Sequence, residues 1–194
     1  MMFMVAATAA PQSTLLVFGD SLSAGYGLAQ DTGWVNLLQQ RFKKNKQNYR
    51  VVNASISGET SAGGRVRLAA ALKQHQPSIL VLQLGANDGL RGLPVAEFRA
   101  NMDAMIKAAL GTRAKVLLIG IRLPTNYGKN YREKFKAAYD DLARRNRISL
   151  VESLLETVEE KRELFQSDGI HPNQQAQAIL LDNVLPGLAP LLRN

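Results

Sequence analysis

The sequence has 194 residues, which suits one domain with a substantial buried core. Hydrophobic residues make up 46% and charged residues 21%, close to the globular average, so a disordered or low-complexity chain is excluded. The absence of cysteine excludes a disulfide framework, a thiolate zinc site and a cysteine nucleophile, while the formal charge of +8 favours anionic partners.

Residues 1–12 are apolar at first and then rich in small residues. Ala7-Thr8-Ala9 resembles a signal-peptide cleavage site, although no basic segment precedes it and the apolar stretch is short. We interpret residues 1–12 as a signal-peptide remnant or a disordered N-terminus; a late start codon is the alternative. No stretch reaches the roughly 20 apolar residues of a membrane-spanning helix, so no transmembrane segment is expected.

Short, apolar, β-branched runs predict five strands, at residues 15–18, 49–52, 79–84, 116–119 and 148–151. Helical periodicity fills the gaps, around residues 34–42, 66–72, 98–106 and 131–144, and from Pro172 towards Pro186. This alternation predicts one α/β domain over residues 13–194, a three-layer α/β/α arrangement with a parallel five-stranded sheet, doubly wound in a flavodoxin-like order. In such sheets the ligand crevice lies beyond the carboxyl ends of the strands.

Only two histidines are available as a catalytic base. His75 ends a predicted helix at the opposite edge from the crevice, so a capping or solvated role is favoured. His171 lies just ahead of the last helix, three residues after Asp168. A tight turn can bring the Asp168 carboxylate to Nδ1 and leave Nε2 free as a base. A plain helix-entry turn is the alternative.

Ser21 directly follows the first strand, where it can be a nucleophile or a helix N-cap. Acyl transfer also needs donors for the developing oxyanion. Gly58 can present a backbone N–H, and Asn87 a side-chain amide from the end of the third strand. Both are also ordinary turn residues.

Four blocks occur in order: Gly19-Asp20-Ser21-Leu22, Gly58, Gly85-Ala86-Asn87-Asp88 and Asp168-Gly169-Ile170-His171. Their order and spacing resemble the motifs of the SGNH (GDSL) hydrolases, and the resemblance covers nearly the whole chain after Ser13. Longer matches at residues 19–27, 53–58, 85–89, 121–128 and 167–172 resemble the bacterial group of multifunctional acyl-CoA thioesterase I, lysophospholipase L1 and arylesterase, also called protease I.

The resemblance implies the SGNH hydrolase fold and hydrolysis of fatty acyl esters and thioesters without metal or cofactor. It implies Ser21 as nucleophile, His171 as general base and Asp168 as its orienting carboxylate. It further implies an oxyanion hole from the Ser21 and Gly58 N–H groups and the Asn87 side chain. Family members of this type are usually periplasmic, which agrees with Ala7-Thr8-Ala9, so we expect a periplasmic rather than a cytoplasmic protein. The resemblance leads us to expect Asp where this chain has Glu59.

Apolar residues of two loops can wall a groove beside Ser21: Leu90, Leu93, Pro94, Ile121, Leu123, Pro124 and Tyr127. Ordinary loop packing is the alternative. A carbohydrate O-acetylesterase is the rival enzyme, and a non-catalytic binder of nucleic acid or anionic surfaces is the rival of another class. Because the basic residues are scattered, we expect no nucleic-acid partner. We also expect a monomer that acts on a small acyl substrate and that can contact anionic lipid.

Overall fold

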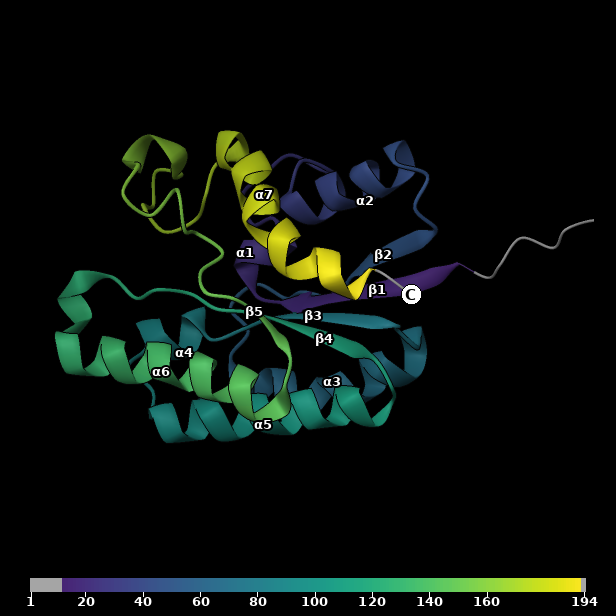
Figure 1. Ribbon diagram of the computed structural model, residues 1–194. Coiled ribbons are helices and arrows are strands. Elements are labelled where there is room, and N and C mark those ends of the chain that lie inside the picture. Colours follow the sequence, from purple (N-terminus) through teal and green to yellow (C-terminus); the bar gives the residue numbers. More distant parts are fainter. Residues whose placement is uncertain (1–11, 193–194) are drawn as a thin grey trace, which may run out of the picture.

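The computed structural model describes residues 12–192. Within them, five parallel strands form one sheet in the order β2-β1-β3-β4-β5 (Figure 1). The strands are β1 (Ser13–Gly19), β2 (Tyr49–Asn53), β3 (Ile79–Gln83), β4 (Lys115–Ile119) and β5 (Ser149–Val151). The predicted doubly wound α/β fold is therefore confirmed. Ala7-Thr8-Ala9 lies outside the described residues, so the signal-peptide remnant stays a prediction.

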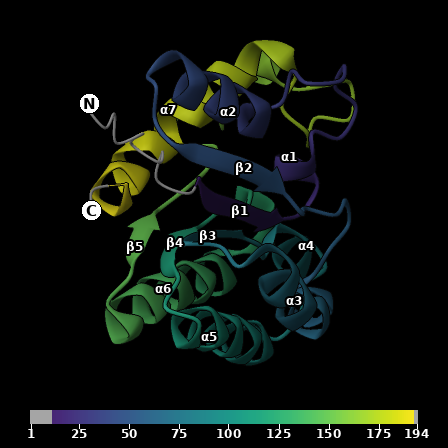
Figure 2. The same cartoon turned by 90° about the vertical axis from the view of Figure 1, so that its right-hand side faces the viewer.

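Helices cover both faces of the sheet (Figures 1 and 2). The longer ones are α2 (Trp34–Lys44), α3 (Ser61–His75), α5 (Val95–Gly111), α6 (Lys129–Asn146) and α7 (Gln177–Leu188). Helices α2 and α7 pack on one face, and α3, α5 and α6 on the other, which gives two separate apolar clusters. No helix of residues 12–192 is long and apolar enough to span a membrane.

Two short helices were not predicted: α1 (Ser21–Ala24) and α4 (Ala86–Leu90). They are too short for an apolar periodicity to develop, and both begin within three residues of a strand's carboxyl end. Val66, an apolar residue of the periodic stretch that predicted α3, is 84% exposed. This helix buries Leu68, Ala71 and Leu72 together with two small residues, Ser61 and Gly64, which carry little hydrophobic signal.

The last helix begins later and ends later than expected. Asn173 caps a 3-10 turn at Gln174–Ala176 before α7 begins, and α7 runs through Pro186 to Leu188. Pro186 lies in the final turns of the helix, where its ring removes only one backbone donor.

The winding of the chain places the crevice. From β1 the chain reaches β2 on one side, and it then returns across the sheet to β3 on the other side. The loops that leave β1, β2 and β3 therefore end at one edge, at the switch point where ligands bind in open parallel sheets. Ser21, Gly58 and Asn87 follow these three strands.

Gly64 allows α3 to lie close to the sheet, and a substitution at this position tests that packing. A Cβ at this position would lie 2.5 Å from the buried Leu84 Cδ1 and 3.3 Å from Phe18 Cε1. We expect Gly64→Ala to lower the free energy of unfolding by about 1–3 kcal/mol through overpacking. Urea unfolding measures it. Gly111→Ala, in α5 with open space around it, is the control and should leave stability unchanged or raise it.

Candidate active site

Ser21 is the first residue of α1, and it is not the N-cap. That position belongs to Asp20, whose side chain accepts a hydrogen bond from the Leu22 N–H at 3.0 Å. The carboxylate thus binds the second N–H of the helix. The Ser21 N–H, the first of the helix, donates to no acceptor within residues 12–192. The Ser21 backbone donor and hydroxyl are both available to a ligand.

The structure brings Ser21, His171 and Asp168 together in one chain of contacts. His171 Nε2 lies 2.9 Å from Ser21 Oγ, and Nδ1 lies 2.7 Å from Asp168 Oδ2. The other oxygen of Asp168 accepts the backbone N–H groups of Ile170 at 2.9 Å and of His171 at 3.0 Å. One carboxylate therefore fixes both the turn and the ring. These hydrogen bonds, led by that from the imidazole, lower the pKa of Asp168 to about 2.

Gln166 links the turn that carries Asp168 and His171 to the loop that follows α1. Its backbone N–H donates to the His171 carbonyl at 2.8 Å, and its side-chain amide donates to the Tyr26 carbonyl at 2.8 Å. The Tyr26 ring lies against the imidazole, with centroids 4.5 Å apart. Gly169, with φ of 68°, supplies the left-handed residue that the tight turn requires. Neither Gln166 nor Tyr26 was predicted to belong to the site: Tyr26 lies within the match at residues 19–27 but was given no role, and Gln166 lies one residue before the match at residues 167–172.

Three donors follow the carboxyl ends of β1, β2 and β3. The Gly58 N–H, like that of Ser21, has no acceptor within the described part of the chain. Gly58 has φ of 80°, and a Cβ there would meet nothing within 4 Å, so its backbone borders open space. The Asn87 side chain donates one N–H to the Glu59 carbonyl at 2.9 Å, which leaves its second N–H available. Such an arrangement can hold an oxyanion.

The loop that carries Gly58 is held at both ends by Arg67 of α3. Its guanidinium donates to the Ala54 carbonyl at 2.8 Å and to the Glu59 carboxylate at 2.6 Å, and it stacks over the Phe18 ring at 3.8 Å. Glu59, the departure from the expected Asp, thus has a defined partner. Asp88 of α4 adds a further link: its carboxylate accepts the Ser61 N–H at 2.8 Å.

Asp20 is a buried acid with no exposed surface. Its Oδ1 also accepts from the Gln83 side chain at 3.1 Å, whereas Oδ2 has no hydrogen-bond partner among residues 12–192. Burial raises the pKa of Asp20 to about 6, against the lowering effects of the hydrogen bonds from Leu22 and Gln83. Asp20 had no predicted role. A signal was present in Gln83, a polar residue that ends an apolar strand.

A cavity of about 400 Å³ is lined by Gly169 and Ile170, which lie between Asp168 and His171 in the sequence. Its walls combine apolar side chains with four charged ones, Arg122, Arg132, Glu159 and Glu160. Its lining includes Leu90, which follows the Asn87 block, and Ile170, which precedes His171. Four of the predicted groove residues line it: Leu90, Ile121, Leu123 and Pro124. Leu93, Pro94 and Tyr127 do not, although the Tyr127 hydroxyl supports the loop by donating to the Leu90 carbonyl at 2.9 Å. We call this space the acyl cavity.

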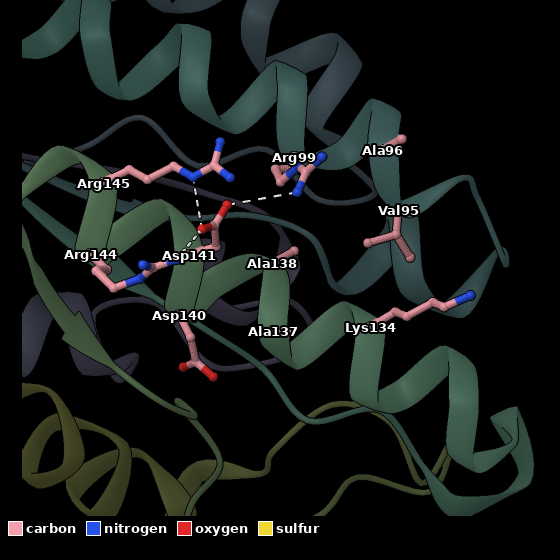
Figure 3. Close-up of a pocket in the computed structure, with 10 residues that line it drawn as sticks. All are labelled: Val95, Ala96, Arg99, Lys134, Ala137, Ala138, Asp140, Asp141, Arg144 and Arg145. Atoms are coloured by element: carbon pink, nitrogen blue, oxygen red, sulfur yellow. Dashed lines mark hydrogen bonds and ion pairs between the residues drawn. The ribbon is translucent and has the colours of Figure 1, made fainter.

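A second groove, of about 540 Å³, lies between α5 and α6 (Figure 3). Neither a candidate catalytic residue nor a sequence neighbour of one lines it, whereas Gly169 and Ile170 of the acyl cavity adjoin Asp168 and His171. Its charges largely satisfy one another, because Asp141 contacts Arg145 at 2.8 Å, Arg144 at 2.7 Å and Arg99 at 3.7 Å. His75 is also remote from the triad, in the last turn of α3 before β3. Within residues 12–192, no group of three or more His, Asp or Glu residues could hold a metal ion.

Comparison with known proteins agrees with this geometry. The family described as GDSL-like Lipase/Acylhydrolase matches residues 17–179. The chain is 50% identical to Esterase TesA of Pseudomonas aeruginosa over 183 residues, which cover 94% of this chain and 91% of that protein. It is 42% identical to Thioesterase 1/protease 1/lysophospholipase L1 of Escherichia coli, covering 96% of this chain and 88% of that protein.

Two further similarities extend the comparison. Arylesterase of Vibrio mimicus is 40% identical over 175 residues, covering 90% of this chain and 88% of that protein. The crystal structure of TesA superposes with a TM-score of 0.90 at 50% identity, covering 92% of this chain and 99% of that one. The resemblance identified from the four sequence blocks is thereby confirmed.

The buried carboxyl of Asp20 predicts a pH-dependent stability. The pKa of Asp20 is about 6 in the folded protein and ordinarily 3.8. The contribution of this carboxyl to the free energy of unfolding is therefore present below pH 3.8 and is lost as the pH rises through 6. This difference in pKa corresponds to about 3 kcal/mol. Asn also serves as an N-cap, so Asp20→Asn should gain stability over the wild type by about this amount between pH 4 and pH 8.

Urea unfolding at several pH values measures this gain. Asp182→Asn, on an exposed carboxylate of α7, is the control and should show no such trend. A difference between wild type and Asp20→Asn that stays constant from pH 4 to pH 8 would show that the folded protein leaves the ionisation of Asp20 unchanged.

Proposed function

The chain belongs to the GDSL-like Lipase/Acylhydrolase family, and we propose that it hydrolyses fatty acyl esters and thioesters through an acyl-enzyme on Ser21. The observation that carries this proposal is the contact chain from Ser21 Oγ through His171 to Asp168, with distances of 2.9 and 2.7 Å. This is the arrangement that activates a serine hydroxyl for attack on a carbonyl.

In the first step Ser21 Oγ attacks the carbonyl carbon while Nε2 of His171 takes the hydroxyl proton. The Ser21 and Gly58 N–H groups and the Asn87 amide stabilise the oxyanion that forms. As the tetrahedral species collapses, the imidazolium gives the proton to the departing alcohol or thiol. Water then attacks the acyl-enzyme with the same general base, which releases the carboxylic acid and restores Ser21. Asp168 remains ionised throughout, consistent with its lowered pKa.

The apolar walls of the acyl cavity support a fatty acyl group as the part of the substrate that is bound. Exposed apolar side chains also border the site: Tyr26 is 52% exposed and Ile170 is 51% exposed. The printed names of the relatives, which include an esterase, a thioesterase/lysophospholipase and an arylesterase, support both ester and thioester substrates. They share the acyl-transfer chemistry and differ in the leaving group.

The rival functions fit these observations less well. A carbohydrate O-acetylesterase would use polar and aromatic walls, and the acyl cavity has both charged residues and Phe165 beside its apolar ones. Trp34, however, is fully buried and donates its indole N–H to the Leu22 carbonyl, so it is not available to stack on a sugar. A non-catalytic binder of anionic surfaces would not need a serine hydroxyl in contact with an imidazole.

Ser21 and Asn87 test the mechanism directly. Ser21→Ala should abolish labelling by an active-site-directed fluorophosphonate and lower kcat by roughly 10⁴-fold or more, because no nucleophile remains. Asn87→Ala removes one oxyanion donor and should lower kcat by about 10²–10³-fold. Steady-state kinetics with a p-nitrophenyl ester measure both. Persistent labelling of Ser21→Ala would place the nucleophile elsewhere.

Leu90, the last residue of α4, and Leu93, three residues later, form a matched pair for the acyl cavity, since only Leu90 lines it. Leu90→Ala should lower kcat/KM roughly tenfold for a dodecanoyl ester and little for an acetyl ester, because apolar contact with the chain is lost. Leu93→Ala should change the two substrates alike. Chain-length profiles of the two variants that coincide would remove this cavity from the account of specificity.

A further inference from the structure

The nucleophile and its base lie on two segments that are far apart in the sequence. Ser21 begins α1, and His171 ends a turn 150 positions later. This turn is closed at its base, because Phe165 and Pro172 form an antiparallel bridge and the Gln166 N–H donates to the His171 carbonyl at 2.8 Å. The place of the turn relative to Ser21 therefore depends on contacts between the two segments.

The Gln166 side chain makes such a contact. Its Nε2 donates to the Tyr26 carbonyl at 2.8 Å and to the Pro172 carbonyl at 3.2 Å. The Tyr26 N–H in turn donates to the Ser21 carbonyl at 3.3 Å. Within residues 12–192, the hydrogen bond from Gln166 to Tyr26 is the only one that joins residues 20–28 to residues 164–173 apart from that between Ser21 and His171.

Together these contacts form a closed cycle. It runs from the Ser21 backbone through Tyr26 and Gln166 to the His171 backbone, and it closes where Ser21 Oγ lies 2.9 Å from His171 Nε2. The Tyr26 ring, 4.5 Å from the imidazole between centroids, packs across the same gap. Because the cycle is closed, a shift of Gln166 changes the separation of the two reacting groups.

The loop after α1 leaves room for the Gln166 amide at Gly27. A Cβ at this position would overlap Gln166 Oε1, so any side chain there would displace the amide. Gly27 also has φ of 72°, a conformation that glycine adopts without strain. The amide of Gln166 is thus held between a bare backbone and the carbonyl of Tyr26.

We propose that Gln166 is a positioning residue of the acyl transfer, whose side-chain amide sets the distance between Ser21 Oγ and His171 Nε2 through the Tyr26 carbonyl. This inference rests on the proposed function. Gln166 does not line the acyl cavity, and it exchanges no proton, which passes from Ser21 Oγ to Nε2 and on to the leaving group. Asp168 orients the imidazole, whereas Gln166 holds the whole turn against the loop after α1.

Gln166→Met tests this role, because it keeps a long side chain and the backbone donor but removes the amide. Since a misplacement of about 1 Å can cost about 10²-fold in rate, we expect the rate constant for inactivation of Ser21 by a fluorophosphonate to fall roughly tenfold. The kcat for p-nitrophenyl butyrate should fall by the same factor with KM unchanged, because the alignment matters only in the chemical step. Gln166→Asn, whose amide is one methylene shorter, should show the same loss.

The final extent of labelling gives the fraction of folded sites, so a variant that merely folds less well loses labelled sites and keeps its rate constant. Gln166 variants whose labelled sites react at the wild-type rate would overturn the proposal, whatever their stability. Gln74→Met, the same change at an exposed position in the last turn of α3, should leave both values unchanged. Failure of the proposed function has a different signature, because wild-type Ser21 would then itself resist the fluorophosphonate.

Discussion

The site depends on one constraint of the sheet, the change in winding direction at β1. All strands are parallel, so their carboxyl ends share one edge, and the chain leaves this edge towards β2 on one side and β3 on the other. The loops bearing Ser21, Gly58 and Asn87 meet where the winding reverses. The turn that carries Asp168 and His171 precedes α7, and it reaches the same edge because α7 packs beside α2 on one face of the sheet. Gln177 of α7 accepts the Trp34 N–H at 3.0 Å, which fixes this packing.

Polar contacts, rather than the apolar core, align the donors of the site. Arg67 bridges the two ends of the oxyanion loop, and Asp88 joins α4 to the start of α3. These groups are held in a low dielectric, where a satisfied hydrogen bond is strong and an unsatisfied group is costly. The core clusters on the two faces of the sheet give stability, while this network gives the loops a single geometry.

The sequence predicted the framework well, because long runs of apolar residues at a regular period report burial directly. All five strands lie within two residues of their predicted bounds at each end. The ordered blocks also indicated which residues meet at the carboxyl edge. Contacts between segments distant in the sequence could not be predicted. The Gln166 side chain donates to the carbonyl of Tyr26, 140 positions away, and Arg67 donates to the carbonyl of Ala54, 13 positions earlier. The apolar pattern also does not show that Gly64 of α3 packs against the sheet, because glycine allows this close approach by having no side chain.

Two carboxyl groups beside one serine have opposite environments, and this difference divides their roles. Asp168 is partly exposed and accepts two backbone N–H groups and the imidazole, so its pKa falls to about 2. Asp20 is buried with one oxygen unsatisfied, so its pKa rises to about 6. Environments that push two such pKa values apart are characteristic of acid–base sites. Asp168 is therefore a fixed negative charge at any working pH, whereas the charge of Asp20 is conditional. Its ionised form opposes folding, because burial removes the carboxylate from water and leaves Oδ2 without a hydrogen-bond partner among the described residues.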